Sequence, residues 1–187
     1  MISIRILSID PGSSHVGFAV LDLTNTNRIT LKHVETFNPN KHLLDVKDVI
    51  EQHGPRFARI LKINQFFYEL MELYKPDIIV CEAPFYNRLR PGAFKALVEV
   101  ISSLQHTVYD YDPSVMFHTT DPSTVKKSVG VKGTSGDKEA IRSAISHLNI
   151  FYGDTIALEV LDEHSVDAIA VGYSKAIDLI NHYWDYL

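Results

Sequence analysis

The chain has 187 residues, of which 45% are hydrophobic and 22% are charged, a composition typical of a globular protein long enough for one domain with a sizeable core. Its single cysteine, Cys81, excludes an intrachain disulfide and indicates a reducing compartment such as the cytoplasm, and no apolar run approaches the roughly 20 residues of a membrane span. The formal net charge of -5 argues against a nucleic-acid partner unless basic residues gather locally.

Three apolar segments in the first third of the chain predict strands. They cover residues 3–9, 15–23 and 29–36, and the turn-forming run DLTNTNR separates the second from the third. We therefore expect an antiparallel meander. The polar stretch that follows, 37–54, predicts a loop with one short helical turn near 43–50.

Helices and strands alternate over the rest of the chain. Gly54 and Pro55 precede a predicted helix over 56–73, and Asp121 with Pro122 has the pattern of a helix N-terminus. The other predicted elements are strands at 78–80 and near 114–118 and helices over 92–105, 137–148 and 163–183. A meander followed by this alternation predicts one α/β domain over 1–187, with a mixed five-stranded sheet flanked by helices.

Two strands end in an acid. In SIDPGSS the apolar run ends at Asp10 before a Pro-Gly turn, and IIVCEAP repeats this pattern at Glu82. Each acid alone is explained by turn or capping chemistry. If the two strands are parallel neighbours, however, both carboxylates share the sheet edge where α/β proteins bind ligands. Two such carboxylates repel each other unless a cation holds them, which favours a metal site.

The segment LDEHSVDAIAVGYS adds two candidate ligands at the start of the last helix. His164 and Asp167 are three residues apart and lie on one helical face, whereas capping explains Asp162 and Glu163. An oxygen-rich site with one imidazole favours Mg²⁺ or Mn²⁺ over zinc. The alternative, a core histidine at position 164, stays open.

Four motifs in this order resemble the RuvC family of Holliday-junction resolvases, in the RNase H-like superfamily. They are SIDPGSSHVGFAV, IIVCEAPFYN, VKKSVGVKGTSGDKEAI and EHSVDAIAVGYS. The resemblance implies an RNase H-like fold and two Mg²⁺ ions per active site, for which Mn²⁺ substitutes. By motif, it assigns metal binding and catalysis to Asp10, Glu82, His164 and Asp167.

The same resemblance implies DNA contacts. Lys126 and Lys138 match family lysines near the cut, with Lys138 counted among the catalytic residues, and Phe85 matches an aromatic residue that stacks on junction bases. Two basic stretches answer the objection from net charge, because phosphate contacts provide most non-specific affinity for DNA. The predicted DNA-binding set is Phe85, Tyr86, Arg88, Arg90, Lys126, Lys127, Lys132 and Lys138.

The function implied is metal-dependent cleavage of four-way DNA junctions by paired, symmetric phosphodiester hydrolysis. The partners are branched DNA and a second copy of the chain, which the family contacts through the helix at residues 92–105. One alternative is a less selective nuclease for branched or flap DNA, as in some phage relatives. Others are an actin-like nucleotide-binding protein, which needs a second Asp-Gly loop that the chain lacks, and a junction-binding protein without catalysis.

Overall fold

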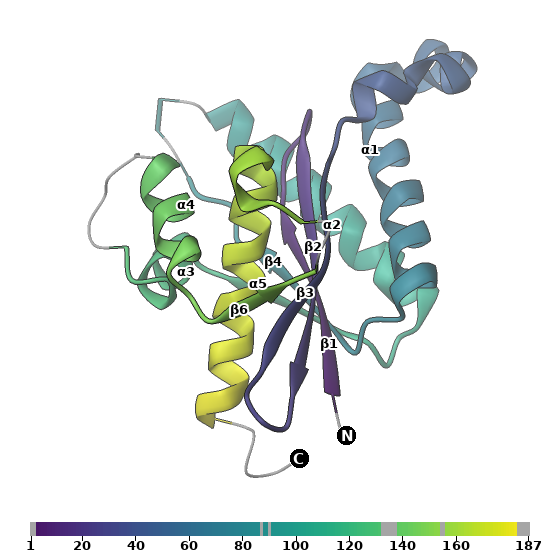
Figure 1. Ribbon diagram of the computed structural model, residues 1–187. Helices are drawn as coiled ribbons and strands as arrows, with labels where there is room; N and C mark the ends of the chain where they lie inside the picture. The colour runs from purple at the N-terminus through teal and green to yellow at the C-terminus, as the bar shows by residue number, and fades with distance from the viewer. Residues whose placement is uncertain (1–2, 87, 90, 132–137, 154–155, 183–187) are drawn as a thin grey trace.

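The computed structural model describes residues 3–86, 88–89, 91–131, 138–153 and 156–182, in which a mixed sheet lies between two layers of helices (Figure 1). The strands are β1 (Ser3–Asp10), β2 (Val16–Thr24), β3 (Ile29–Phe37), β4 (Ile78–Glu82), β5 (Met116–Thr120) and β6 (Ile150–Tyr152). The helices are η1 (Pro39–Val46), α1 (Lys47–Tyr74), α2 (Pro91–Tyr111), α3 (Pro122–Ser128), α4 (Lys138–Ser146), η2 (Leu158–Val160) and α5 (Glu163–His182).

The strand order is β5-β4-β1-β2-β3-β6. β1, β2 and β3 form the predicted antiparallel meander. β4 is parallel to β1, β5 is parallel to β4, and β6 is parallel to β3. The C-terminal ends of β1, β4 and β5 therefore lie together at one edge of the sheet, and the predicted α/β class is confirmed.

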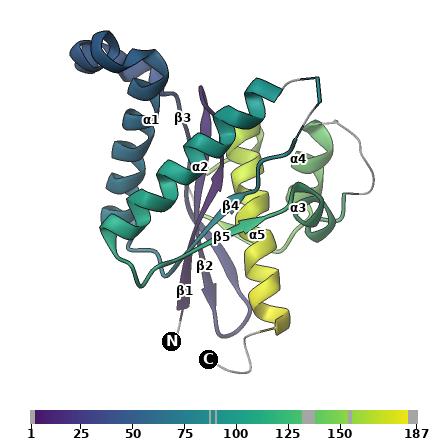
Figure 2. The same ribbon diagram turned by 180° about the vertical axis from the view of Figure 1, so that it is seen from behind.

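Helices cover both faces of the sheet. α1 and α2 lie on one face, and α3, α4 and α5 lie on the other, as Figures 1 and 2 show from opposite sides. Side chains of β1 alternate between the two layers: Ile6 packs with α5, and Leu7 and Ile9 pack with α1 and α2. The buried hydroxyl of Ser8 donates a hydrogen bond to the Ala168 carbonyl (2.7 Å), which fixes α5 against β1.

The sequence predicts five strands, and the observed sheet has one more. In the described residues the sheet has six strands, and β6 pairs with β3 from Ile29↔Ile150 to Leu31↔Tyr152. A three-residue strand is too short to show an alternating pattern in the sequence.

The predicted loop over 37–54 is wrong for most of its length, because Phe37 ends β3 and helical structure, expected only near 43–50, covers the segment from Pro39 up to Gly54. η1 covers its first part, and α1 begins at Lys47 rather than at 56. Gly54 interrupts α1 with non-helical backbone angles, including a positive φ of 83° that other residues rarely take, so α1 consists of two helical segments and the second starts where the sequence predicts a helix. The Gly54-Pro55 pair therefore marks the predicted helix start, whereas the helical structure before it is longer than predicted.

Other element boundaries differ by a few residues. α2 continues beyond the predicted end at 105, and β5 begins at Met116 rather than at 114. Asp121 occupies the N-cap position of α3 as predicted, but its side chain makes no capping hydrogen bond. No helix among the described residues is both long and apolar enough to cross a membrane.

Candidate active site

β1 and β4 place the two strand-end acids at the same edge of the sheet. In this parallel pair Ile9 lies opposite Cys81, so Asp10 and Glu82 are the next residues on the two strands. The Asp10 side chain is only 13% exposed, and Glu82 is partly buried. The juxtaposition expected from the sequence is therefore present.

α5 begins close to the ends of β2 and β3. The Asp162 carboxylate accepts hydrogen bonds from the Ser165 backbone N–H (2.9 Å) and from the Thr36 hydroxyl (2.6 Å). Asp162 thus caps α5 and ties it to β3, as the capping interpretation predicted. Gly17 of β2 faces the His164 carbonyl so closely that an added Cβ would collide with it. These contacts bring the first turn of α5 over the end of the sheet.

We expect Gly17→Ala to destabilise the protein by about 2 kcal/mol, in the range for overpacked sites, because the clash is with backbone and relief requires a shift of α5. The matched control is Gly92→Ala at the start of α2, where an added Cβ meets no atom within 4 Å. Urea unfolding of both variants measures the difference. A Gly17→Ala protein as stable as the control would contradict this close approach.

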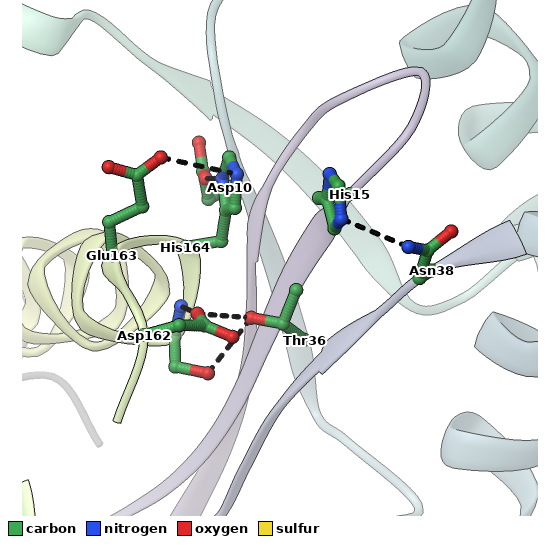
Figure 3. Close-up of polar contacts among 8 residues, drawn as sticks. Asp10, His15, Thr36, Asn38, Asp162, Glu163 and His164 are labelled. Carbon is green, nitrogen blue, oxygen red and sulfur yellow. Dashed lines mark hydrogen bonds and ion pairs between the residues drawn. The ribbon is translucent and has the colours of Figure 1, made fainter. Parts of the chain in front are cut away.

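The imidazole of His164 meets the Asp10 carboxylate. Nδ1 of His164 lies 2.8 Å from Oδ2 of Asp10, and Nε2 lies 3.7 Å from Oε1 of Glu163 (Figure 3). About a third of the His164 side chain is exposed (32%). The alternative of a core histidine is therefore not supported, since this ring bonds a strand-end acid and reaches solvent.

Electrostatics link residues of four elements. The pKa of Glu82 is raised to about 7, chiefly by burial and then by the charges of Asp10 and Asp167, while Lys126 of α3 opposes the rise. Burial also raises the pKa of Asp10, against the effect of its hydrogen bond with His164. That hydrogen bond is the main cause of the raised pKa of His164. Two carboxylates, those of Asp10 and Asp167, thus act on the third, that of Glu82, at this edge of the sheet.

The donor chemistry of this cluster fits a hard divalent cation. A cation would relieve the repulsion by which Asp10 and Asp167 raise the pKa of Glu82, and oxygen ligands with one imidazole suit Mg²⁺ or Mn²⁺. As they stand, no three His, Cys, Asp or Glu side chains in the described part of the chain are arranged to hold a metal ion. Cys81 is fully buried in the apolar cluster with α1 and α2, away from such a site.

A pocket of about 530 Å³ opens beside His164. Asp167 and His15 contribute to its wall, and so does Arg142, whose guanidinium donates to the carbonyls of Leu158 (2.6 Å) and Leu161 (2.7 Å). Arg142 therefore holds the segment that leads into α5. His15 was not among the predicted site residues, although it lies between Asp10 and Gly17 in the first motif.

The predicted DNA-binding residues fall on two segments near the carboxylate edge. Phe85 (70% exposed), Tyr86 (55%) and the exposed Arg88 follow β4. On α3, Lys126 is partly buried near Glu82 and Lys127 is exposed. Arg90 and Lys132 lie outside the described residues, as does the side chain of Lys138, the first residue of α4.

Comparisons with known proteins point to one group. No family model matches the chain. A Prochlorococcus marinus protein named crossover junction endodeoxyribonuclease RuvC is 26% identical over 173 residues, which is 91% of this chain and 95% of that protein. A Bdellovibrio bacteriovorus protein of the same name is 33% identical over 93 residues, 50% of this chain and 48% of that protein.

Two solved structures share the fold. Thermus thermophilus RuvC in complex with a Holliday junction substrate matches with a TM-score of 0.69 at 16% identity, over 96% of this chain and 97% of that one. The yeast mitochondrial Holliday junction resolvase Ydc2 matches with a TM-score of 0.66 at 15% identity, over 98% of this chain and 82% of that one.

Proposed function

We propose that this chain, which is RuvC-like in both sequence and fold, is a metal-dependent endonuclease that resolves Holliday junctions by paired phosphodiester hydrolysis. The observation that carries the proposal is the meeting of Asp10, Glu82 and the first turn of α5 at one edge of the sheet. The likeness to a RuvC protein extends along 91% of the chain.

Asp10, Glu82, His164 and Asp167 are the residues that would hold two Mg²⁺ ions, with Mn²⁺ as a substitute. Two such ions activate a water molecule for attack and stabilise the leaving oxygen of the phosphodiester. The chain's own contribution is to hold the ligands. When Asp10 is ionised, its carboxylate accepts a hydrogen bond from Nδ1–H of His164. In the neutral imidazole this leaves Nε2 with its lone pair.

DNA affinity would come from residues around this edge. The exposed rings of Phe85 and Tyr86 offer faces on which bases stack, and Arg88 and Lys127 offer charges to phosphates. We propose DNA contacts also for Arg90 and Lys132, which belong to the two basic stretches of the sequence, and for Lys138, which matches a family lysine and would also stabilise the transition state. A local basic surface reconciles DNA binding with the net charge of -5.

Lys126 and Lys127 give a matched pair for a test. Lys126 favours the ionised form of Glu82, so we expect Lys126→Ala to slow cleavage at saturating DNA by at least about tenfold. Lys127→Ala should leave that rate unchanged and lower the salt dependence of binding by about one phosphate contact. Single-turnover cleavage and binding titrations at several salt concentrations measure both. If Lys126→Ala and Lys127→Ala changed the cleavage rate equally, Lys126 would not belong to the active site.

Symmetric cutting of a junction requires two identical sites, which a two-fold dimer provides. We propose that α2 contributes to this dimer, since Val98 (41% exposed) and Tyr109 (70% exposed) leave apolar surface on it while Val100 and Leu104 face the core.

Cytoplasmic location is part of the same proposal, in keeping with the buried Cys81, which forms no disulfide.

The function is tested by digesting matched four-way, forked and linear DNA with the purified protein in Mg²⁺ or in EDTA. We expect Mg²⁺-dependent cleavage with a clear preference for the four-way junction. Equal cleavage of forked DNA would favour the less selective branched-DNA nuclease. Tight junction binding with no cleavage in Mg²⁺ would indicate a non-catalytic junction-binding protein.

A further inference from the structure

A second histidine lies against the first. His15, in the turn between β1 and β2, stacks on His164, with ring centroids 5.5 Å apart and ring planes inclined by 5°. Offset stacking of aromatic rings is favourable at this separation. The two rings come from distant parts of the chain and both line the pocket (Figure 3).

His15 is itself held in place by Asn38. Oδ1 of Asn38 accepts the Asn40 backbone N–H (3.0 Å), so its amide Nδ2 is the atom that faces Nε2 of His15 at 3.0 Å. An amide nitrogen only donates, and Nε2 of His15 is therefore the acceptor. This bond fixes the His15 ring from the side of η1, opposite to its contact with His164.

The His164 ring needs such support. The torsion that turns an imidazole about its Cβ–Cγ bond has a broad energy profile, and one hydrogen bond in the ring plane does not stop the ring from tilting. The hydrogen bond between Nδ1 of His164 and Asp10 is of this kind. A parallel ring against the face of His164 restricts the tilt that the hydrogen bond allows.

We propose that His15 is a positioning residue, whose ring, anchored by Asn38, holds the His164 imidazole with Nδ1 on Asp10 and Nε2 on the pocket side. The proposal rests on the proposed function, in which His164 belongs to the catalytic site. His15 acts through His164 and does not itself contact the reacting atoms. This positioning role also accounts for the aromatic ring of His15 in a turn whose other residues are small.

The test compares His15→Ala with His15→Phe, which keeps an aromatic ring face but loses both ring nitrogens and with them the bond to Asn38. We expect His15→Ala to lower kcat for junction cleavage by about tenfold with KM little changed, as for a misplaced catalytic group. His15→Phe should stay within about threefold of wild type. In a His164→Asp background, where no second ring exists, His15→Ala should have no further effect.

A second readout uses neither metal nor DNA. In nitrogen-proton correlation spectra of the metal-free protein, the Nδ1–H signal of His164 should be present in wild type and His15→Phe and lost or shifted in His15→Ala. An unchanged His164 signal in His15→Ala would overturn the proposal. So would a raised KM with unchanged kcat, which would place His15 on the DNA. If the wild-type protein cleaves no junction, the proposed function fails, while the spectra still decide the positioning role.

Discussion

Asp10→Asn should lower the rate of junction cleavage by at least about a thousandfold, because groups that act as a unit lose most of their effect when one is removed. The carboxylate is buried at the end of β1 and bonds His164. Asparagine keeps an oxygen that can accept the hydrogen bond from Nδ1–H of His164, but it loses the charge that would hold a cation. The fold should therefore stay intact while the site fails.

Junction binding separates this effect from a general loss of structure. Since DNA affinity comes mainly from phosphate contacts, the Asp10→Asn protein should bind the junction within about threefold of wild type. Asp48→Asn, which removes the same charge from the exposed start of α1, is the control. An Asp10→Asn protein that cuts within tenfold of the wild-type rate in Mg²⁺, an order-of-magnitude limit, would exclude Asp10 from the metal site.

Glu82→Gln should stabilise the metal-free protein at pH 8 by about 3 kcal/mol while it abolishes cleavage. The pKa of Glu82 is raised from 4.5 to about 7 in the folded protein. Folding therefore favours the protonated form, and stability is lost as pH rises from the unfolded pKa through the folded one. Above about pH 7 the full penalty applies to wild type, and glutamine, which does not ionise, avoids it.

Urea unfolding in EDTA at pH 5 and at pH 8 measures this difference. Wild type should lose stability relative to Glu82→Gln between the two pH values, and Mg²⁺ at pH 8 should restore more stability to wild type than to the variant. Glu69→Gln on the exposed side of α1 is the control. Parallel pH profiles for wild type and Glu82→Gln would show that burial and the charges of Asp10 and Asp167 do not raise the pKa of Glu82.

The edge that carries Asp10 and Glu82 was predictable because the same local pattern, an apolar strand that ends in an acid, occurs twice. Chain order then made the two strands parallel neighbours, and the observed register agrees. Capping of α5 by Asp162 was predictable for the same reason, since the pattern is local. By contrast, β6 has too few residues to produce a pattern, and η1 and the helical turns before Gly54 lie in a polar stretch that predicted a loop.

His15 was not predictable from sequence, because its contact with His164 joins residues far apart in the chain. A histidine within a turn of small residues has many ordinary explanations. Only the stacking on His164 and the anchor at Asn38 give it a defined place. The raised pKa of Glu82 likewise depends on burial and on charges from other elements, which no local pattern contains.

The most direct test of the central claim is to map the cuts on a four-way junction labelled in turn on each of its four strands. We expect Mg²⁺-dependent incision of two opposing strands at symmetric positions, which yields two nicked duplexes that a DNA ligase seals. Unpaired cuts at unrelated positions, or products that cannot be ligated, would contradict a junction-resolving endonuclease.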